Sequence, residues 1–328
     1  MIRNQWYVVL ESKQVGVNPI GVTRLGEKLV FWRDSDKKVH CAFDRCPHRG
    51  VQLSIGKIHR GNLQCPFHGF EYDSSGKCLL IPAEGRVNEP PAAMRLKIYP
   101  TFEQHDFIWI WWGENPPSNL ESPSFFDNID DGSVYGSAID PWKTHYSRVI
   151  ENQLDVAHLP FVHYNTIGRG NRTVVDGPIV DWCDESQKIM CIYVFNRVDD
   201  GTPPRSRDEI RKQTRQVHLE FIMPNLWQNF ISDEARVVAA FVPIDDENTL
   251  LYLRFYQKFL SLPFLGKLVA QLSMPFNLYI VHQDRIVVET QSPKVSSLKG
   301  GNEKPIKADS PIIMYRRQRE QLKKSIAI

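Results

Sequence analysis

Two short segments of this 328-residue chain each combine a cysteine with a histidine. Residues 46–50 read CPHRG and residues 65–69 read CPFHG, so the pattern is Cys-x-His, sixteen residues, then Cys-x-x-His. Proline stiffens each segment, and the glycine that closes it lets the backbone bend tightly. Four side chains of the metal-ligating types in two loops constrain the fold strongly, because the loops must face one another around a shared centre.

Each loop offers one thiolate and one imidazole, and this mixture bears on the kind of metal centre. A structural zinc ion needs four converging ligands and usually draws pairs such as Cys-x-x-Cys. A two-iron cluster with two cysteines on one iron and two histidines on the other accounts for the mixture, because opposed loops can each place a cysteine deep and a histidine toward the tip. We predict a Rieske-type [2Fe–2S] cluster, with zinc as the alternative, on Cys46, His48, Cys65 and His68.

A second group of candidate ligands follows further along the chain. Residues 151–163 read ENQLDVAHLPFVH, in which Asp155, His158 and His163 form the pattern Asp-x-x-His-x₄-His. On a helix, Asp155 and His158 share a face. His158 and His163 are five residues apart, which on a regular helix leaves them roughly 140° out of line. Pro160 removes a backbone donor between them, so we predict a broken helix that brings both imidazoles to one metal.

The carboxylate that completes such a site is Asp284, within the helical segment YIVHQDRIVVE at residues 279–289. Two imidazoles and one carboxylate form the facial triad of non-haem Fe(II), which leaves positions open for O₂ and substrate. Zinc accepts the same donors, and a His-x₄-His pair by itself is more often structural. The joint occurrence with the Cys/His loops favours a mononuclear iron bound by His158, His163 and Asp284.

The hydrophobic pattern divides the chain into two domains. As far as residue 115, short strand-like runs such as WYVVL, KLVFWR, VHCAF and FIWIWWG alternate with turn residues, which predicts an all-β domain. A segment rich in proline and serine leads into the second domain, residues 116–328, which mixes helices with strands and is predicted to be α+β. Its predicted helices are 146–162, 262–289 and a basic helix from Ser310, and its predicted strands are 189–195, 217–223, 236–242 and 249–255.

Composition argues against several classes of function. The 40 Lys and Arg balance 38 Asp and Glu to a net charge of +2, which is not the strongly basic balance of a nucleic-acid binder. The N-terminus lacks an apolar run of signal-peptide length, and no stretch reaches the ~20 apolar residues of a spanning helix. We expect a cytoplasmic protein in a reducing compartment. The remaining cysteines are expected to be small buried apolar residues: Cys41, Cys78, Cys183 and Cys191.

Taken together, these motifs resemble the oxygenase α subunit of the Rieske non-haem iron oxygenases. The resemblance runs from NQWY at residues 4–7 through FIWIWWG to VHQD at residues 281–284. The short chain is most similar to the phthalate, vanillate and dicamba type. Respiratory Rieske proteins have an additional cysteine in each loop, where this chain has Val51 and Phe67. The resemblance implies a helix-grip-like antiparallel sheet in the catalytic domain.

The resemblance also implies an activity and its partners. A reductase or ferredoxin passes electrons from NAD(P)H to the cluster and on to the mononuclear iron, where O₂ serves to hydroxylate or demethylate a small organic, aromatic substrate. Monooxygenation is expected ahead of dihydroxylation. Asp155 is assigned a bridge from a cluster histidine, His68, of a neighbouring subunit to His158 in a head-to-tail homotrimer. The alternative is an electron carrier or binding protein with no oxygenase chemistry.

Two further sets of residues are candidates for binding. The substrate pocket is expected to be apolar and aromatic. Its candidate lining residues are Phe161, Val162, Phe221, Trp227 and Asn229. The basic residues near the cluster loops are candidates for docking an acidic reductase or ferredoxin, with a solvated surface as the alternative. They are Arg45, Arg49, Lys57 and Arg60.

Overall fold

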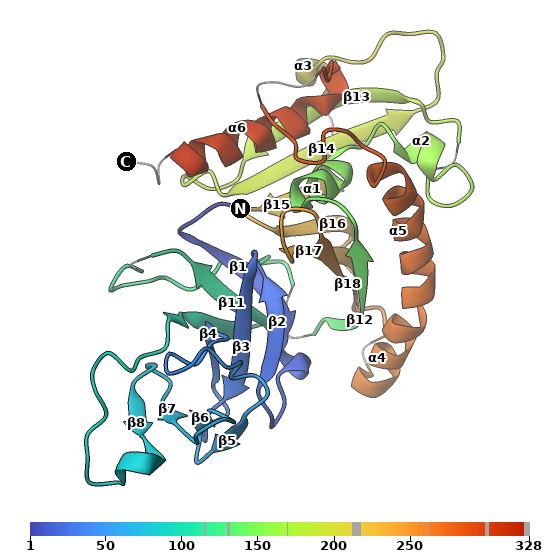
Figure 1. The fold of residues 1–328 in the computed structure, drawn as a ribbon. Helices are drawn as coiled ribbons and strands as arrows, with labels where there is room; N and C mark the ends of the chain where they lie inside the picture. Colours follow the sequence, from blue (N-terminus) through green and yellow to red (C-terminus); the bar gives the residue numbers. More distant parts are fainter. Residues whose placement is uncertain are drawn as a thin grey trace. The chain divides into compact units, whose positions relative to one another are not determined.

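The computed structural model describes residues 1–114, 116–129, 132–168, 170–211, 218–260, 262–298 and 302–324. The chain forms two compact units, Arg3–Pro123 and Ser124–Ile328 (Figure 1). The domain boundary predicted between residues 115 and 116 stays a prediction, and residue 115 lies outside the described residues.

The first unit is all-β, as predicted, and consists of small antiparallel sheets. One sheet has the order β1-β11-β10, with β1 at Gln5–Glu11, β11 at Phe107–Trp112 and β10 at Thr101–Gln104. A second has the order β2-β3-β4-β9, with bounds Ile20–Arg24, Glu27–Arg33, Val39–Phe43 and Ile98–Tyr99. The four predicted strands are confirmed as β1, β3, β4 and β11.

A third sheet of the first unit carries the cysteine and histidine loops. Its order is β5-β6-β7-β8, with bounds Lys57–His59, Asn62–Gln64, Glu71–Tyr72 and Cys78–Leu80. The four strands are short, and their core includes Cys46, Cys65 and Tyr72 packed with Trp32 and Leu63. The loops are therefore mounted on a small hydrophobic core of their own.

The second unit is built on one seven-stranded antiparallel sheet, which confirms the predicted α+β class and sheet type. The strand order is β12-β18-β17-β16-β15-β14-β13. The bounds of β12 to β15 are Val134–Trp142, Val174–Trp182, Ile189–Arg197 and His218–Ile222. Those of β16 to β18 are Leu226–Ser232, Ala235–Pro243 and Thr249–Gln257. The four predicted strands are confirmed, although residue 217 lies outside the described part of the chain.

Two of the three predicted helices are interrupted. The predicted helix 146–162 is α1 (Tyr146–Leu154) and a single turn, α2 (Leu159–Val162). The predicted helix 262–289 is α4 (Pro263–Leu272) and α5 (Met274–Val288), which meet at Ser273 because Pro275 lacks the N–H that would continue α4. The basic C-terminal helix is confirmed as α6 (Ser310–Lys324), and a short α3 spans Arg207–Arg211.

The cysteine prediction holds for one pair and is wrong for the other. Cys41 and Cys78 are free and buried, as expected. Cys183 and Cys191 form a disulfide instead, and Cys183 is exposed. The two lie on either side of the turn between β13 and β14, where the Cys183 N–H donates to Ile189 O at 2.8 Å. The hairpin thus brings together two cysteines eight residues apart. This contact could not be predicted from the sequence because strand β13 was not.

Candidate active site and metal centres

The two cysteine and histidine loops have the same backbone construction. The N–H of Gly50 donates to Cys46 O at 2.8 Å, and the N–H of Gly69 donates to Cys65 O at 3.1 Å. Gly50 and Gly69 have φ values of 74° and 73°, a left-handed conformation that glycine adopts without strain. The matching turns present each cysteine from the base of its loop and each histidine from nearer the tip.

The side chains follow that depth. Cys46 and Cys65 are 2% and 3% exposed, whereas His48 is exposed and His68 is half-buried. The rings of the two histidines meet edge to face, with centroids 4.8 Å apart, and His48 stacks on Phe70. The structure therefore brings all four predicted residues of the loops to one place, with sulfur inside and nitrogen outside.

The donor set fits a two-iron cluster better than one zinc ion. Four ligands of a tetrahedral ion must converge on one point, but among the described residues the loop side chains do not form such a tight group. Burial raises the pKa of the Cys65 thiol, while backbone N–H groups of Phe67 and His68 oppose that rise by hydrogen bonding to its sulfur. Such N–H groups are suited to stabilise the sulfurs of an iron–sulfur cluster.

The second candidate centre is assembled from the link between α1 and α2 and from α5. His158 is at the N-cap position of α2, His163 is at its C-cap position, and Asp284 lies in the last turns of α5. The predicted break is present but displaced: α1 ends at Leu154, and Pro160 starts α2 instead of kinking one continuous helix. Proline is favoured in the first turn of a helix, where its missing N–H costs nothing.

The three predicted ligands converge in space. Their ligand atoms all lie within 4.8 Å of one another. Asp284 Oδ1 is 3.0 Å from His163 Nε2 and 3.3 Å from His158 Nε2. Asp284 and His163 are 3% and 1% exposed. Asp284 Oδ1 nevertheless makes no hydrogen bond of acceptable geometry within the described chain, so the atoms surround a point between them, as ligands of one metal ion would.

Charge in this group is strongly coupled. Burial disfavours the ionised Asp284 carboxylate, but the imidazoles of His158 and His163 outweigh it and hold its pKa at about 2. Burial likewise disfavours charged His158, yet the carboxylates of Asp155 and Asp284 raise its pKa to about 9. Protonated His158 balances the negative charge of Asp155 and Asp284 in this structure, and a bound divalent cation would take over that role.

The orientation of His163 depends on a residue that the sequence did not reveal. His163 Nδ1 lies 2.9 Å from Gln283 Oε1, which can only accept, so Nδ1 carries the proton and the Nε2 lone pair is directed at the centre. The hydroxyl of Thr166 also donates to Gln283 Oε1, at 3.1 Å, and Gln283 Nε2 donates to Asn165. The only feature of the sequence that could have pointed to Gln283 is its position directly before the candidate ligand Asp284.

The prediction that Asp155 and His158 share a helical face is wrong, because both lie in the link between α1 and α2. Asp155 Oδ2 is still 3.6 Å from His158 Nδ1. Its other oxygen accepts from the N–H of Ala157 at 2.7 Å. The carboxylate therefore stands beside the imidazole edge that points away from Asp284.

A cavity of about 580 Å³ opens beside the three candidate ligands. Its lining comes from the strands β15 to β18, from residues 152–167 and from α5. Its lining away from the ligands is largely apolar, and includes Leu219, Ile231, Val237, Leu251, Leu253, Phe255, Phe276 and Ile280. This volume is suited to a small organic molecule.

The predicted pocket residues are partly right. Trp227 and Asn229 line the cavity, but Phe161, Val162 and Phe221 do not. Phe161 is 66% exposed, because it lies on the outer side of the single turn α2. Phe221 is buried against Tyr315 of α6, with ring centroids 5.5 Å apart. The sequence does not distinguish these environments without the positions of α2 and α6.

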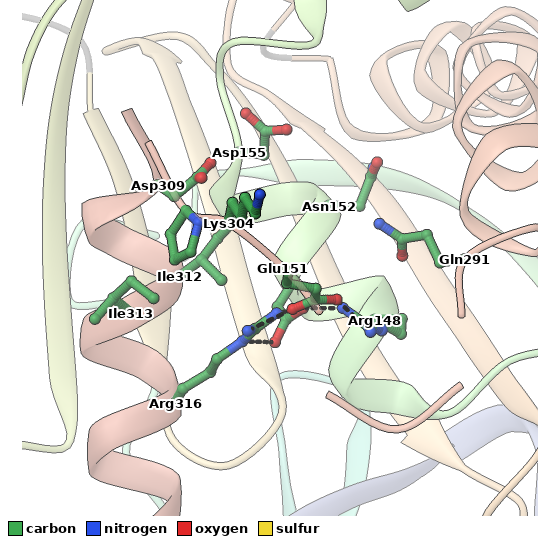
Figure 2. Close-up of a pocket in the computed structure, with 12 residues that line it drawn as sticks. Arg148, Glu151, Asn152, Asp155, Gln291, Lys304, Asp309, Ile312, Ile313 and Arg316 are labelled. Carbon is green, nitrogen blue, oxygen red and sulfur yellow. Dashed lines mark hydrogen bonds and ion pairs between the residues drawn. The ribbon is translucent and has the colours of Figure 1, made fainter. Parts of the chain in front are cut away.

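A second, polar hollow of about 200 Å³ lies between α1 and α6 (Figure 2). In it, buried Glu151 accepts hydrogen bonds from Arg316 at 2.8 Å and from Arg148 at 3.0 Å. Asp155 lines both this hollow and the apolar cavity. Burial raises the pKa of Asp309 across the hollow, and the charge of Asp155 adds to that rise.

Comparison with protein families matches both units. The family model of the Rieske [2Fe-2S] domain matches residues 5–100, and that of the vanillate O-demethylase oxygenase C-terminal domain matches residues 142–325. The vanillate O-demethylase oxygenase subunit of a Pseudomonas species is 31% identical over 212 residues, 64% of this chain and 57% of the relative. The dicamba O-demethylase oxygenase component of Stenotrophomonas maltophilia is 32% identical over 163 residues, 49% of this chain and 48% of the relative. The chain thus spans about half the length of these relatives.

Solved structures share the fold. NdmA of Pseudomonas putida CBB5 has a TM-score of 0.77 at 22% identity, covering 98% of this chain and 91% of that chain. Apo dicamba monooxygenase has a TM-score of 0.73 at 20% identity, covering 100% of this chain and 98% of that chain. At these identities the similarity concerns the fold and not the substrate.

Proposed function

Because the chain belongs to the vanillate O-demethylase oxygenase family of Rieske proteins, we propose that it is the terminal oxygenase component of a multicomponent system. The reaction is O₂-dependent hydroxylation or demethylation of a small organic, apolar or aromatic substrate, with monooxygenation favoured over dihydroxylation. The observation that carries the proposal is the convergence of His158, His163 and Asp284 at the wall of an apolar cavity.

The family's cofactors are a Rieske [2Fe–2S] cluster and a mononuclear iron. We assign the cluster to Cys46, His48, Cys65 and His68, where it supplies single electrons at a potential raised by histidine ligation. We assign the iron to His158, His163 and Asp284, where it supplies the reductive activation of O₂.

The protein's own residues prepare that chemistry. Gln283 keeps the proton of His163 on Nδ1, so that Nε2 is free to bind a metal. The apolar lining excludes water and holds a substrate against the ligands. Leu219, Val237 and Phe255 come from three strands of one sheet and give this wall a fixed shape.

For electron delivery we propose a head-to-tail homotrimer, in which His68 of one subunit meets Asp155 of the next. The position of Asp155 supports its role as a bridge between subunits, because its carboxylate lies 3.6 Å from His158 and also lines the polar hollow. An imidazole–carboxylate–imidazole contact is charge-assisted and geometrically specific. We further propose that a reductase or ferredoxin docks at the exposed basic residues near the cluster loops, which are Arg45, Arg49, Lys57 and Arg60.

Iron content combined with substitution of Asp284 tests the proposal. We expect about three Fe per chain, two from the cluster and one from the mononuclear site. Asp284→Ala should lower this to about two, retain the cluster's absorption and EPR spectra, and abolish substrate-dependent O₂ uptake with a surrogate reductase. If the wild type contains only the cluster iron when fully loaded, the protein is an electron carrier, and the oxygenase proposal is wrong.

A further inference from the structure

Helix α4 and the first half of α5 expose a continuous row of large apolar side chains. The row follows helical spacing along both helices, and its most exposed members are Phe264 at 83% and Leu272 at 71%. We call this row the apolar stripe. It consists of Phe264, Leu265, Leu268, Leu272, Phe276 and Tyr279, each at least 42% exposed.

The small residues of α4 face the protein, so the large ones cannot turn inward. Ala270 is fully buried, and a Cβ placed on Gly136 of β12 would come within 2.3 Å of its carbonyl oxygen. Gly266 is equally confined, because a Cβ there would lie 2.5 Å from Leu260 O. The side chain of Gln271 fixes this approach by bonding the backbone of Ser137 in both directions, at 3.1 and 3.2 Å. The stripe is therefore held outward by the way α4 packs.

The charged residues of the segment that carries the stripe have one sign before Asp284. Between Lys258 and Asp284 the sequence contains no Asp or Glu, and its charged residues there are Lys258 and Lys267. Lys267 is exposed on α4, within the stripe's length. Apolar side chains with an exposed basic group among them complement a lipid bilayer with anionic headgroups.

In contrast to the expectation from the sequence, one segment is long and apolar enough to cross a membrane by length and composition, but its contacts hold it on the protein. Phe264–Val288 has a best-window mean hydropathy of 1.2, with 22% of that window buried. Asp284 lies inside the candidate metal centre, and His282 and Arg285 contact the buried Asp140 at 2.9 and 2.7 Å. These contacts require the second half of α5 to stay on the sheet domain.

We propose that the apolar stripe docks this protein on the surface of an anionic bilayer, with α4 lying in the interfacial plane. Amphipathic helices bind in this way when apolar side chains enter the headgroup boundary and basic ones remain at its edge. Lys267 extends its ammonium group to the lipid phosphates while its methylene chain stays among the apolar neighbours. Phe276 belongs both to the stripe and to the cavity lining, so the docked face adjoins the cavity. The docking proposal is independent of the proposed oxygenase activity.

Vesicle flotation of the full-length purified protein tests the proposal. We expect wild-type protein to float with vesicles of phosphatidylglycerol and phosphatidylcholine, and to float less with phosphatidylcholine alone or in high salt. The double variant Phe264→Glu/Leu272→Glu should bind at least about tenfold less. The matched control is Val17→Glu/Val87→Glu, which places the same charges on two side chains of the other unit that are 90% and 98% exposed, and it should bind as wild type does.

A second variant and a mass measurement complete the test. Lys267→Gln keeps the stripe intact and should reduce binding to anionic vesicles only, with unchanged binding to phosphatidylcholine. Light scattering and thermal unfolding of each variant establish whether the chain is folded and in which assembly. The proposal is overturned if wild-type protein does not float with either vesicle, or if the double variant floats as well as wild type does. It is also overturned if the double substitution lowers the molar mass of the assembly while wild-type protein stays unbound. The last result would identify the stripe as an interface between copies.

Discussion

Replacing Gln283 with leucine should weaken iron binding without removing a ligand. His163 is 1% exposed, and its Nδ1–H has Gln283 Oε1 as its acceptor at 2.9 Å. Leaving a buried donor without a partner costs about 1–3 kcal/mol. The imidazole of His163 in Gln283→Leu avoids this cost by moving its proton to Nε2, which lies 3.0 Å from Asp284 Oδ1. Iron must then displace that proton, so we expect its affinity to fall about 10- to 100-fold.

Anaerobic Fe(II) titration of protein stripped of mononuclear iron measures this affinity, and the cluster absorption shows that the first unit is intact. Gln283→Glu retains an oxygen acceptor and should bind iron far better than Gln283→Leu. Thr166→Val is a matched control, because it removes a 3.1 Å bond to Gln283 but leaves the bond to His163. An affinity of Gln283→Leu within about twofold of wild type would refute the assigned tautomer.

Three other substitutions examine separate parts of the structure. Asp155→Asn should slow single-turnover electron transfer between the cluster and the mononuclear iron while light scattering shows an unchanged assembly, and unaltered rates would contradict the bridge. Arg316→Met removes two hydrogen bonds from the buried Glu151 and should lower the free energy of unfolding by about 3 kcal/mol in denaturant titrations; a loss under about 0.5 kcal/mol would show that the pair is not stabilising. Cys183→Ser/Cys191→Ser opens an eight-residue loop and should cost about 2.5 kcal/mol in the same titration under oxidising conditions, whereas equal stability of both proteins would mean that the disulfide does not form in solution.

The elements that the sequence predicted well are those with unbroken patterns. Strands β3, β11, β17 and β18 are continuous apolar or alternating runs, and they are central or well covered in their sheets. Of the strands of the seven-stranded sheet that were not predicted, β16 is interior, whereas β12 and β13 are the two edges. Each of the two edge strands contains a proline, Pro141 or Pro178, which an edge strand tolerates but which breaks the pattern.

The metal-ligand residues of the candidate site could be predicted from their residue types, but the residues that orient those ligands could not. His158, His163 and Asp284 were identified from residue type and joint occurrence, and they meet in the structure. Gln283 was not, because its contact with His163 joins positions 120 residues apart and a glutamine on a helix has no distinctive pattern. The helix break was predicted at Pro160, but Pro160 lies in the first turn of α2. A proline can either interrupt a helix or begin one, and only the tertiary contacts decide which.

The three candidate iron ligands come from both ends of a long stretch of chain. His158 and His163 precede β13, whereas Asp284 follows β18, so strands β13 to β18 must be in place before the carboxylate reaches the imidazoles. A partly folded chain offers two histidines five residues apart and no third donor. Metallation should therefore be a late event in biogenesis, and the occupancy of this centre reports how many molecules in a preparation have matured.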